Sequence, residues 1–437
     1  MEDCLSTVMA ALPPADLARC RAVCRRWLRC SDSVLSDVGA EFLFRPRAHE
    51  VGSRSSALTV RCESADGLDV QLERAPGAWT PGAAAAARAV SGAVSWAVSG
   101  ASHPCLANRV VTKVTCVGGG VGALRCDVVE GLGSLRELEV NADSDPNRLA
   151  LPRLLHALEA LRALHTLKVP FNGLGSSDAD AISRCVSLTS LDLFKNDVGE
   201  AGAASLARLP GLTSLDVGNN ALGSKGVAAL ETLTKLRCLG VSFNDADDES
   251  IARCVLAMKS LVNLRCTWNQ SGGRTGMAIA SLARLKSLHV AYSEAHLFAH
   301  SLQTVRTLTE LDATSAGIGK DAAAALSRLA ALRKLCLANN DLGSEGAAAL
   351  ARGPVASALT SLDVSWNSIG FRGAVEMART MASLSSLNIR HNVVLDVGVR
   401  ALARLPALVD LDASHNFVTE STSRYVRGVN RKKIRNL

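Results

Sequence analysis

The sequence of 437 residues has few aromatic side chains, no Cys-x-x-Cys pair and no long apolar run. Aromatic residues account for 3% of the chain and hydrophobic residues for 48%, so its core must be mainly aliphatic. The 13 cysteines are an odd number without the Cys and His spacing of zinc sites, which indicates free thiols in a reducing compartment. No uncharged apolar stretch reaches about 18 residues, so we expect no membrane-spanning helix.

Charge and catalytic motifs are equally sparse. The net charge is +7 and the basic residues are spread along the chain, which disfavours a dedicated nucleic-acid-binding protein. The chain begins Met1-Glu2-Asp3, which lacks the positive charge of a secretory signal, so we expect a cytoplasmic protein. It contains no glycine-rich phosphate loop, no His-Glu-x-x-His and no Gly-x-Ser-x-Gly. We therefore expect a non-catalytic protein without a metal or cofactor.

An internal repeat dominates the chain from residue 111 onward. The segment at Leu188 reads Leu-Thr-Ser-Leu-Asp-Leu-Phe-Lys-Asn, and it returns at Leu212 as Leu-Thr-Ser-Leu-Asp-Val-Gly-Asn-Asn. Thirteen units follow one another at intervals of 23 to 29 residues, and seven of the intervals are 24. The units start at Val111, Leu135, Leu164, Leu188, Leu212, Leu236, Leu261, Leu285, Leu308, Leu332, Leu359, Leu384 and Leu408.

Each unit combines a strand pattern, an asparagine position and a helix pattern. The Leu-x-Leu pair puts two apolar side chains on one face of a short strand, because side chains alternate between the faces. Nine units carry an Asn that can bond backbone groups where the chain leaves the strand, whereas Ser293 and Ala316 replace it in two consecutive units. A stretch such as Gly202-Ala-Ala-Ser-Leu-Ala then predicts a short helix. One unit cannot enclose its own core, so the units must stack.

These features resemble leucine-rich repeats, and the Gly-Ala-x-x-Leu-Ala stretch is similar to the GALA type. The resemblance implies an α/β fold, a leucine-rich-repeat solenoid with a curved parallel β-sheet and short helices on its convex side. It covers residues 111–423 in about 13 units.

The first 45 residues follow a different pattern. Apolar residues from Leu5 to Leu12 have helical spacing, Pro13 ends that helix, and a second amphipathic helix continues to Trp27. The alternative to a partner-binding element is a helical cap on the first repeat, which needs apolar faces but no particular residue order. The segments that resemble an F-box in identity and spacing are Leu12-Pro13, Asp16-Leu17 and Val23-Cys24-Arg25-Arg26-Trp27.

The resemblance implies a small all-α F-box in residues 1–45 that binds a Skp-type adaptor and, through it, the cullin and RING subunits. The F-box family usually opens with another Leu-Pro pair, which this sequence lacks. By residue-to-residue carry-over, the adaptor contacts would be Leu5, Val8, Leu12, Pro13, Leu17 and Val23.

Two further segments complete the chain. Residues 46–110 are expected to form a linker and a degenerate first repeat or N-terminal cap. Within them, residues 57–62 and 68–73 alternate like a hairpin, and Thr80-Pro81 is a helix start. Residues 424–437 are expected to form a basic C-terminal tail, which either is simply solvated or serves nuclear import or an acidic partner.

Two columns of the expected sheet are candidate contacts with a target protein. The residue between the two Leu-type positions is often Asp, which would favour a basic partner, although Asp is also common there in leucine-rich repeats. The residue before the Asn position is often aromatic or His, which suits an interface but also packing at the sheet edge. The candidates are Asp192, Asp216, Asp312 and Asp363 in the first column and Phe243, Trp268, Tyr292, Trp366 and His391 in the second.

We therefore expect the substrate-recognition subunit of an SCF-type (Skp, cullin, F-box) ubiquitin ligase, whose repeat sheet holds an unknown target protein. The alternative is a leucine-rich-repeat protein-binding or inhibitor module with no ubiquitin-ligase link. The expected location is the cytoplasm, with the nucleus as the alternative, or the host-cell cytoplasm for a protein of a pathogen or virus.

Overall fold

The computed structural model describes residues 41–44, 56–64, 67–74, 110–117, 135–141, 155 and 158–429. The chain divides into two compact units, and each is described by itself. Unit 1 comprises Met1–Val198 and Arg208–Leu212, and unit 2 comprises Gly199–Ala207 and Thr213–Leu437. The helical pair expected between Leu5 and Trp27, with its adaptor contacts, and the helix expected after Thr80 lie outside the described residues.

Unit 1 begins with antiparallel strands and continues as a parallel sheet. Strand β2 (Ser56–Ser64) pairs antiparallel with β1 (Glu41–Phe44) and with β3 (Gly67–Arg74), and the second pair closes between Ser64 and Gly67. This confirms the expected hairpin, whereas the sequence analysis did not foresee β1. Strand β3 pairs in parallel with β4 (Val110–Val117), which is followed by β5 (Glu137–Asn141), β6 (Thr166–Lys168) and β7 (Ser190–Asp192). The described helices of this unit include η2 (Leu158–Ala160) and α7 (Ser176–Ser183).

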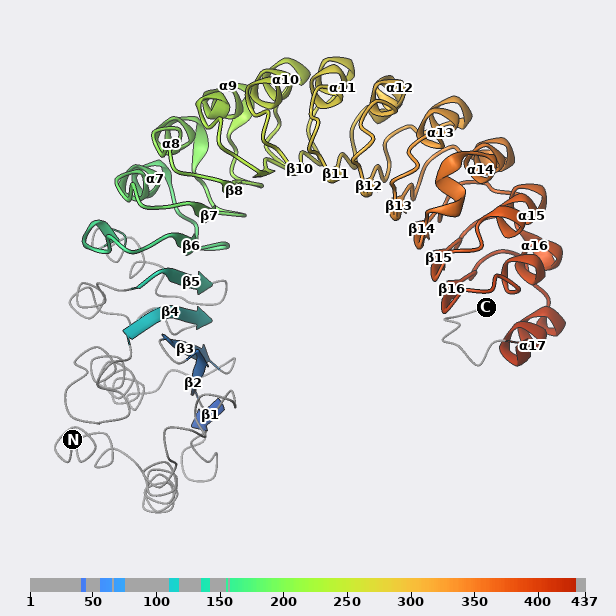
Figure 1. Cartoon of the computed structure of the whole chain (residues 1–437), viewed down its shortest axis with the longest axis horizontal. Helices are drawn as coiled ribbons and strands as arrows, with labels where there is room; N and C mark the ends of the chain where they lie inside the picture. The colour runs from blue at the N-terminus through green and yellow to red at the C-terminus, as the bar shows by residue number, and fades with distance from the viewer. Residues whose placement is uncertain are drawn as a thin grey trace. The chain divides into compact units, whose positions relative to one another are not determined.

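Unit 2 repeats a short strand and a short helix along its whole length. Its neighbouring strands are parallel and in register, so that Leu215 lies beside Leu239 and Leu239 beside Leu264. In Figure 1 the strands follow the inner edge of this unit and the helices follow its outer edge. The expected leucine-rich-repeat solenoid is thereby confirmed.

The strands of unit 2 are β8 (Ser214–Asp216), β9 (Cys238–Gly240), β10 (Asn263–Arg265), β11 (Ser287–His289), β12 (Glu310–Asp312), β13 (Lys334–Cys336), β14 (Ser361–Asp363), β15 (Ser386–Asn388) and β16 (Asp410–Asp412). The helices are α8 (Gly199–Leu206), α9 (Gly223–Ala229), η3 (Leu230–Thr232), α10 (Asp248–Ala257), α11 (Gly273–Ala280), η4 (Ala295–Leu297), α12 (Ala299–Leu302), α13 (Lys320–Leu326), α14 (Gly343–Arg352), η5 (Pro354–Ser357), α15 (Phe371–Thr380), α16 (Leu395–Leu402) and α17 (Glu420–Val429).

The core of unit 2 lies between strands and helices. The central leucine of every strand from β8 to β16 is at most 2% exposed, and burying such a side chain contributes about 2 kcal/mol. The helices combine buried aliphatic side chains with glycines that allow close approach. Phe298, the bulkiest fully buried side chain among the described residues, fits because Gly276 faces it. A Cβ on Gly276 would lie 1.8 Å from the Phe298 Cβ, so the glycine is required there.

The ladder asparagines join successive coils through their side-chain amides. The Oδ1 atom of Asn392 accepts hydrogen bonds from the backbone N–H groups of Asn367 (3.1 Å) and Ile369 (2.8 Å) in the preceding coil. Its Nδ2 donates to the carbonyls of Val364 and Ile389, both at 2.9 Å. Each such amide therefore pairs polar backbone groups at a point where the buried chain turns. The members in unit 2 are Asn220, Asn244, Asn269, Asn340, Asn367, Asn392 and Asn416.

The ladder is interrupted between Asn269 and Asn340. The hydroxyl of Ser293 donates to the carbonyl of Val290 within its own coil (2.5 Å), and Ala316 has no polar side chain. The two substitutions noticed in the sequence therefore remove the side-chain link between successive coils at this point.

The C-terminal boundary differs from the expectation. Helix α17 continues to Val429, so the first residues of the segment expected to be a tail belong to the last helix. Val426 is fully buried, and the Tyr425 hydroxyl accepts a hydrogen bond from Arg404 Nε at 3.1 Å. The apolar face of α17 was hidden in the sequence by the arginines around it.

Replacing Asn269 with Ala should lower the free energy of unfolding by about 2–3 kcal/mol, since it leaves buried backbone groups unpaired. The Asn269 Oδ1 accepts from the N–H groups of Asn244 (3.3 Å) and Ala246 (3.1 Å), and Nδ2 donates to the carbonyl of Val241 (2.9 Å). Urea unfolding followed by circular dichroism measures the change. Gln270→Ala, one residue along on the exposed surface, is the control and should change it by less than about 0.5 kcal/mol. Equal effects of the two variants would contradict a structural role of the ladder.

Candidate protein-binding face

The residue that precedes each ladder position forms an exposed column at the edge of the strands. We call this the edge column. In unit 2 it consists of Asn219, Phe243, Trp268, Tyr292, Ser315, Asn339, Trp366, His391 and His415. Every one of these residues has a positive φ, between 52° and 57°.

The positive φ accompanies a regular set of backbone bonds between coils. The N–H of Phe243 donates to the carbonyl of Thr267 (2.9 Å), the N–H of Trp268 to Ala291 (3.0 Å), and the same bond recurs along the unit. A residue other than glycine in this left-handed conformation costs about 1–2 kcal/mol. The column nevertheless carries large rings instead of glycine, so these side chains must contribute something that offsets the cost.

The rings of the edge column stack into two separate groups. Phe243 and Trp268 have ring centroids 5.6 Å apart, and Trp268 and Tyr292 have centroids 4.1 Å apart, with interplanar angles of 20° and 22°. We call these three residues the first ring stack. The second ring stack consists of Trp366, His391 and His415, with centroids 3.6 and 4.0 Å apart.

The stacked rings are also accessible to a partner. Phe243 and Tyr292 are each 44% exposed, Trp268 is 48% exposed and Trp366 is 54% exposed. The sequence suggested either an interface or packing at the sheet edge for this column. The two are compatible, because the rings pack on each other and still present their edges to solvent. Aromatic side chains that are rigid and half-exposed are typical anchors of protein interfaces.

The Asp column has a mainly structural geometry. Asp312 Oδ1 accepts from the backbone N–H of Thr314 (3.0 Å), and Asp363 Oδ1 accepts from that of Ser365 (2.9 Å). Asp216 makes the same bond to Gly218 at 3.0 Å, and Asp192, in unit 1, makes it to Phe194 at 2.9 Å. Each carboxylate therefore closes the turn after its own strand.

Basic or amide side chains engage the remaining carboxylate oxygens in part of this column. Asp216 Oδ2 pairs with Arg265 at 2.8 Å across strand β9. Gly240 makes this reach possible, because a Cβ there would lie 2.6 Å from Asp216 Oδ1. Asp363 Oδ2 accepts from Asn388 Nδ2 at 2.8 Å. The column is consequently less of a free acidic strip than its sequence indicates.

Asp312 illustrates the electrostatics of this column. Burial by itself raises the pKa of Asp312, but the nearby His289 and the hydrogen bonds from Thr314 outweigh it and hold the pKa below its ordinary value. The carboxylate is therefore ionised at neutral pH. Its second oxygen lies 3.7 Å from His289 Nδ1.

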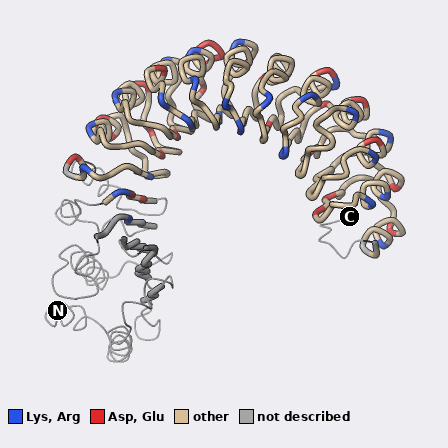
Figure 2. Tube along the Cα trace, in the orientation of Figure 1, with Lys and Arg blue, Asp and Glu red and all other residues tan. Residues whose placement is uncertain are grey.

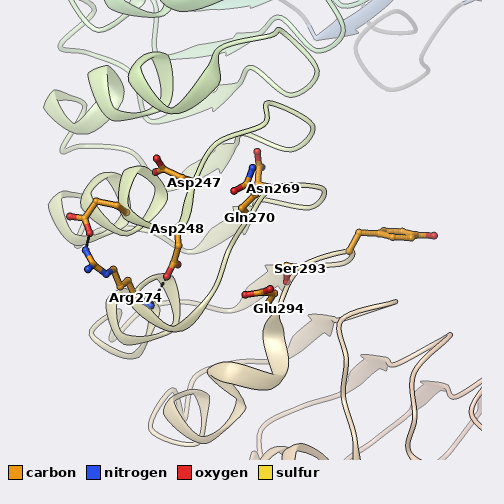
Figure 3. A pocket seen from close by; sticks show the side chains of 9 residues that line it. Asp247, Asp248, Asn269, Gln270, Arg274, Ser293 and Glu294 are labelled. Carbon is orange, nitrogen blue, oxygen red and sulfur yellow. Dashed lines mark hydrogen bonds and ion pairs between the residues drawn. The ribbon is translucent and has the colours of Figure 1, made fainter.

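An open pocket of about 790 Å³ lies beside the interruption of the asparagine ladder. Figure 3 shows Asp247, Asp248 and Arg274 on one side of it and Ser293 and Glu294 on another. The complete lining is Asp247, Asp248, Glu249, Asn269, Gln270, Arg274, Tyr292, Ser293 and Glu294.

The acidic residues of this pocket are largely committed to helix ends. Asp247 caps α10 through the N–H of Ser250 at 2.8 Å. Asp248 accepts from the backbone N–H groups of Gly272 (2.8 Å), Arg274 (2.9 Å) and Thr275 (2.8 Å). Burial raises the pKa of Asp248, and the hydrogen bonds from Thr275, Gly272 and Arg274 reverse this and lower it. The pocket therefore does not present a free acid–base pair.

Other chemistry is equally scarce in the described part of the chain. Burial raises the pKa of the Cys185 thiol to about 11 and that of Cys254 and of Cys266 to about 12, so these thiols are poor nucleophiles. Among the described residues, no group of three or more His, Cys, Asp or Glu side chains is arranged to hold a metal ion. No helix in this part is both long and apolar enough to cross a bilayer.

Charge is mixed along unit 2. Figure 2 shows basic and acidic positions alternating around it, without a long tract of one sign. Binding through this face would therefore depend on local groups more than on a general field.

The sequence did not reveal the positive φ of the edge column or its division into two ring stacks. Equivalent residues of adjacent coils lie side by side, so the repeat period in the sequence could have predicted the stacking. The six expected adaptor contacts lie outside the described residues.

Two protein families match parts of this chain. Residues 2–38 match the F-box domain. The Leucine Rich repeat family matches residues 184–207, 210–230, 331–351, 357–378 and 380–403. The chain thus combines an F-box domain with leucine-rich repeats. The matched repeat family is general and does not distinguish the GALA type.

Two solved structures with a similar arrangement come from bacteria. An internalin of Listeria monocytogenes is 18% identical, covers 76% of this chain and 81% of its own, and has a TM-score of 0.47. A leucine-rich-repeat protein of Leptospira interrogans is 15% identical, covers 71% of this chain and 92% of its own, and has a TM-score of 0.43. Comparison with curated proteins gives no match.

The second ring stack predicts a measurable property of His391. Partial burial lowers the pKa of His391 below 6.5, and the neighbouring charges of His415 and Arg390 lower it further. Because the folded-state pKa is depressed, the stability from neutral His391 is complete above the unfolded pKa and is lost as pH falls through the folded one. His415→Gln should raise the pKa of His391 towards 6.5 in an NMR titration.

The control for this titration is Phe243→Gln, which changes the same column in the other ring stack. It should leave the pKa of His391 unchanged. If His415→Gln also leaves the pKa where it was, the stack does not control the titration of His391.

Proposed function

We propose that this chain is the substrate-recognition subunit of an SCF-type ubiquitin ligase. The observation that carries the proposal is the presence, in one chain, of an F-box match at residues 2–38 and a leucine-rich-repeat solenoid. F-box domains generally bind Skp-type adaptors, and leucine-rich repeats generally bind other proteins. The two together suit a subunit that connects a target protein to the ligase.

The adaptor would bind the F-box segment, and the cullin and RING subunits would follow through the adaptor. The residues expected to contact it are Leu5, Val8, Leu12, Pro13, Leu17 and Val23. Their support is the order Leu-Pro, Asp-Leu and Val-Cys-Arg-Arg-Trp, which a simple helical cap would not need.

The target would bind the inner side of unit 2, with the edge column as its main anchor. The first ring stack and Trp366 supply exposed aromatic area in a fixed conformation, which limits the entropy lost on binding. The Asp column would serve mainly to hold the strand ends.

Such a subunit acts by proximity. Holding a target beside a ubiquitin-charged enzyme raises the effective concentration of the reacting groups, so this chain needs no catalytic residue of its own. The buried thiols and capped carboxylates of the described residues agree with this role. The cytoplasm, or the nucleus, is where such a ligase would encounter its targets.

The test is a pull-down of the purified full chain with a eukaryotic Skp-type adaptor. Changing Leu12, Pro13 and Val23 together to Ala should weaken adaptor binding at least about thirtyfold, because each removes an apolar anchor. Circular dichroism of the triple variant should match the unchanged chain.

The matched control is a substitution in the repeat face, away from the F-box segment. Trp268→Asn changes the repeat face and should retain full adaptor binding. Adaptor binding that survives the triple change, or that is absent from the unchanged chain, would contradict the proposal and favour a protein-binding module with no ligase link.

A further inference from the structure

The two ring stacks leave a gap of two positions in the edge column. Tyr292 ends the first ring stack and Trp366 begins the second, and Ser315 and Asn339 occupy the positions between them. Ring faces within a stack cover each other. In contrast, the Tyr292 face towards Ser315 and the Trp366 face towards Asn339 have no ring beside them in the column.

The spacing of the gap suits planar groups. Tyr292 and Trp366 are three coils apart, and with strands about 4.8 Å apart their positions are separated by about 14 Å. That leaves room for two further planar groups at the spacing of the existing rings. The N–H groups of Ser315 and Asn339 continue the same backbone pattern, at 2.9 Å and 2.8 Å to the next coil, so the gap lacks rings but is not a break in the fold.

The floor of the gap is short and polar. Asn339 Nδ2 donates to Ser315 Oγ at 2.7 Å, which holds both side chains together across the two positions. The next column towards the strands contains Thr314 and Ala338 here, which are also small. A partner's side chain can therefore enter between Tyr292 and Trp366 without displacing a bulky residue.

The charged groups around the gap are mainly acidic. We considered strands β11 to β14 and the two residues after each edge-column position from Tyr292 to Trp366. The basic side chains there are Lys334 and His289. Five carboxylates belong to the same positions. They are Glu294, Glu310, Asp312, Asp341 and Asp363, of which Asp312 and Asp363 also accept hydrogen bonds from their own turns.

We propose that this gap binds arginine side chains of an extended basic segment of a target protein, with guanidinium groups stacked against Tyr292 and Trp366. Guanidinium is planar, stacks on aromatic faces and pairs with carboxylates, whereas the lysine ammonium is a compact, strongly hydrated charge. The inference rests on the proposed function, since it names the kind of partner that the repeat face takes.

The probes are 12-residue peptides of alternating glycine with arginine or with lysine, titrated calorimetrically into the full chain. The arginine peptide should bind at least about fivefold more tightly than the lysine peptide. A 12-nucleotide oligouridylate tests the other source of planar groups and should not bind, since the carboxylates repel phosphates. Equal affinity of the two peptides, binding of neither, or preferential binding of the oligouridylate would overturn the inference.

Filling or opening the gap locates the binding. Asn339→Trp should weaken arginine-peptide binding at least about fivefold by placing a ring in the gap, and Asn219→Trp, the same change outside it, should not. Trp366→Asn should weaken binding by removing a face. Folding is preserved because the column already accepts Trp and Asn at this φ. Equal effects inside and outside the gap would overturn the inference.

The adaptor pull-down with Asn339→Trp separates this inference from the proposed function. Intact adaptor binding together with an absence of arginine preference would overturn the inference alone. Arginine preference in a chain that binds no adaptor would overturn the ligase role and leave the binding site in place.

Discussion

The repeated backbone hydrogen bond from the edge-column N–H groups to the carbonyls of the next coil is the constraint on which unit 2 depends. It runs from Asn219 to His391, and every edge-column residue, including His415 in the last coil, has φ between 52° and 57°, whatever its side chain. That conformation turns the following asparagine inward, where its amide pairs the backbone groups of two coils. It also directs the edge-column side chain outward, beside its equivalents in the adjacent coils. The buried ladder and the exposed ring stacks are thus two consequences of one turn.

The asparagine ladder and the row of stacked rings are interrupted at neighbouring positions. Ser293 and Ala316 remove the inward amides from two coils, and Ser315, next to Ala316, is the first position without a ring after the first ring stack. The backbone continues through this region, because Tyr292 and Ser315 keep their N–H bonds to Thr314 and Ala338. Strand pairing therefore continues through these coils without the asparagine link, and other side chains join them, such as Thr307, whose hydroxyl donates to the carbonyl of Leu285 at 2.7 Å. The open pocket, which includes Tyr292 and Ser293, and the gap that begins after Tyr292 are therefore adjacent in the sequence.

Much of the fold could be predicted because its signals are local and repeated. The Leu-x-Leu positions gave the strands from β8 to β16, and alternation in residues 57–62 and 68–73 gave the β2–β3 hairpin. The four residues of β1 carry no such repetition, and the pairing that defines them comes from a distant segment. The end of α17 was missed because arginines mask the burial of Val426.

The candidate face was only partly readable for a different reason. The sequence shows which residues share a column but not which bonds they make. Asp216 reads as a free carboxylate until Gly240 is seen to let it reach Arg265 across a strand. Similarly, the sequence places the aromatic residues in one column, but their contacts, such as Trp268 against Tyr292, come from the structure. The repeat period shows which residues share a column. The bonds and contacts of each side chain depend on its neighbours one and two coils away.

The edge column separates the folding of unit 2 from the choice of the side chains that the unit exposes. Its positions accept Asn, Phe, Trp, Tyr, Ser and His with almost the same φ, so the backbone does not depend on the side chain present. Asn is the residue best suited to this conformation after glycine, and a ring there must recover the cost of about 1–2 kcal/mol through stacking or binding. A single ring without a neighbour recovers little by stacking, which is why rings occur in groups. The exposed faces at the ends of those groups, at Tyr292 and Trp366, are where stacking within the chain stops and where the proposed guanidinium groups would stack.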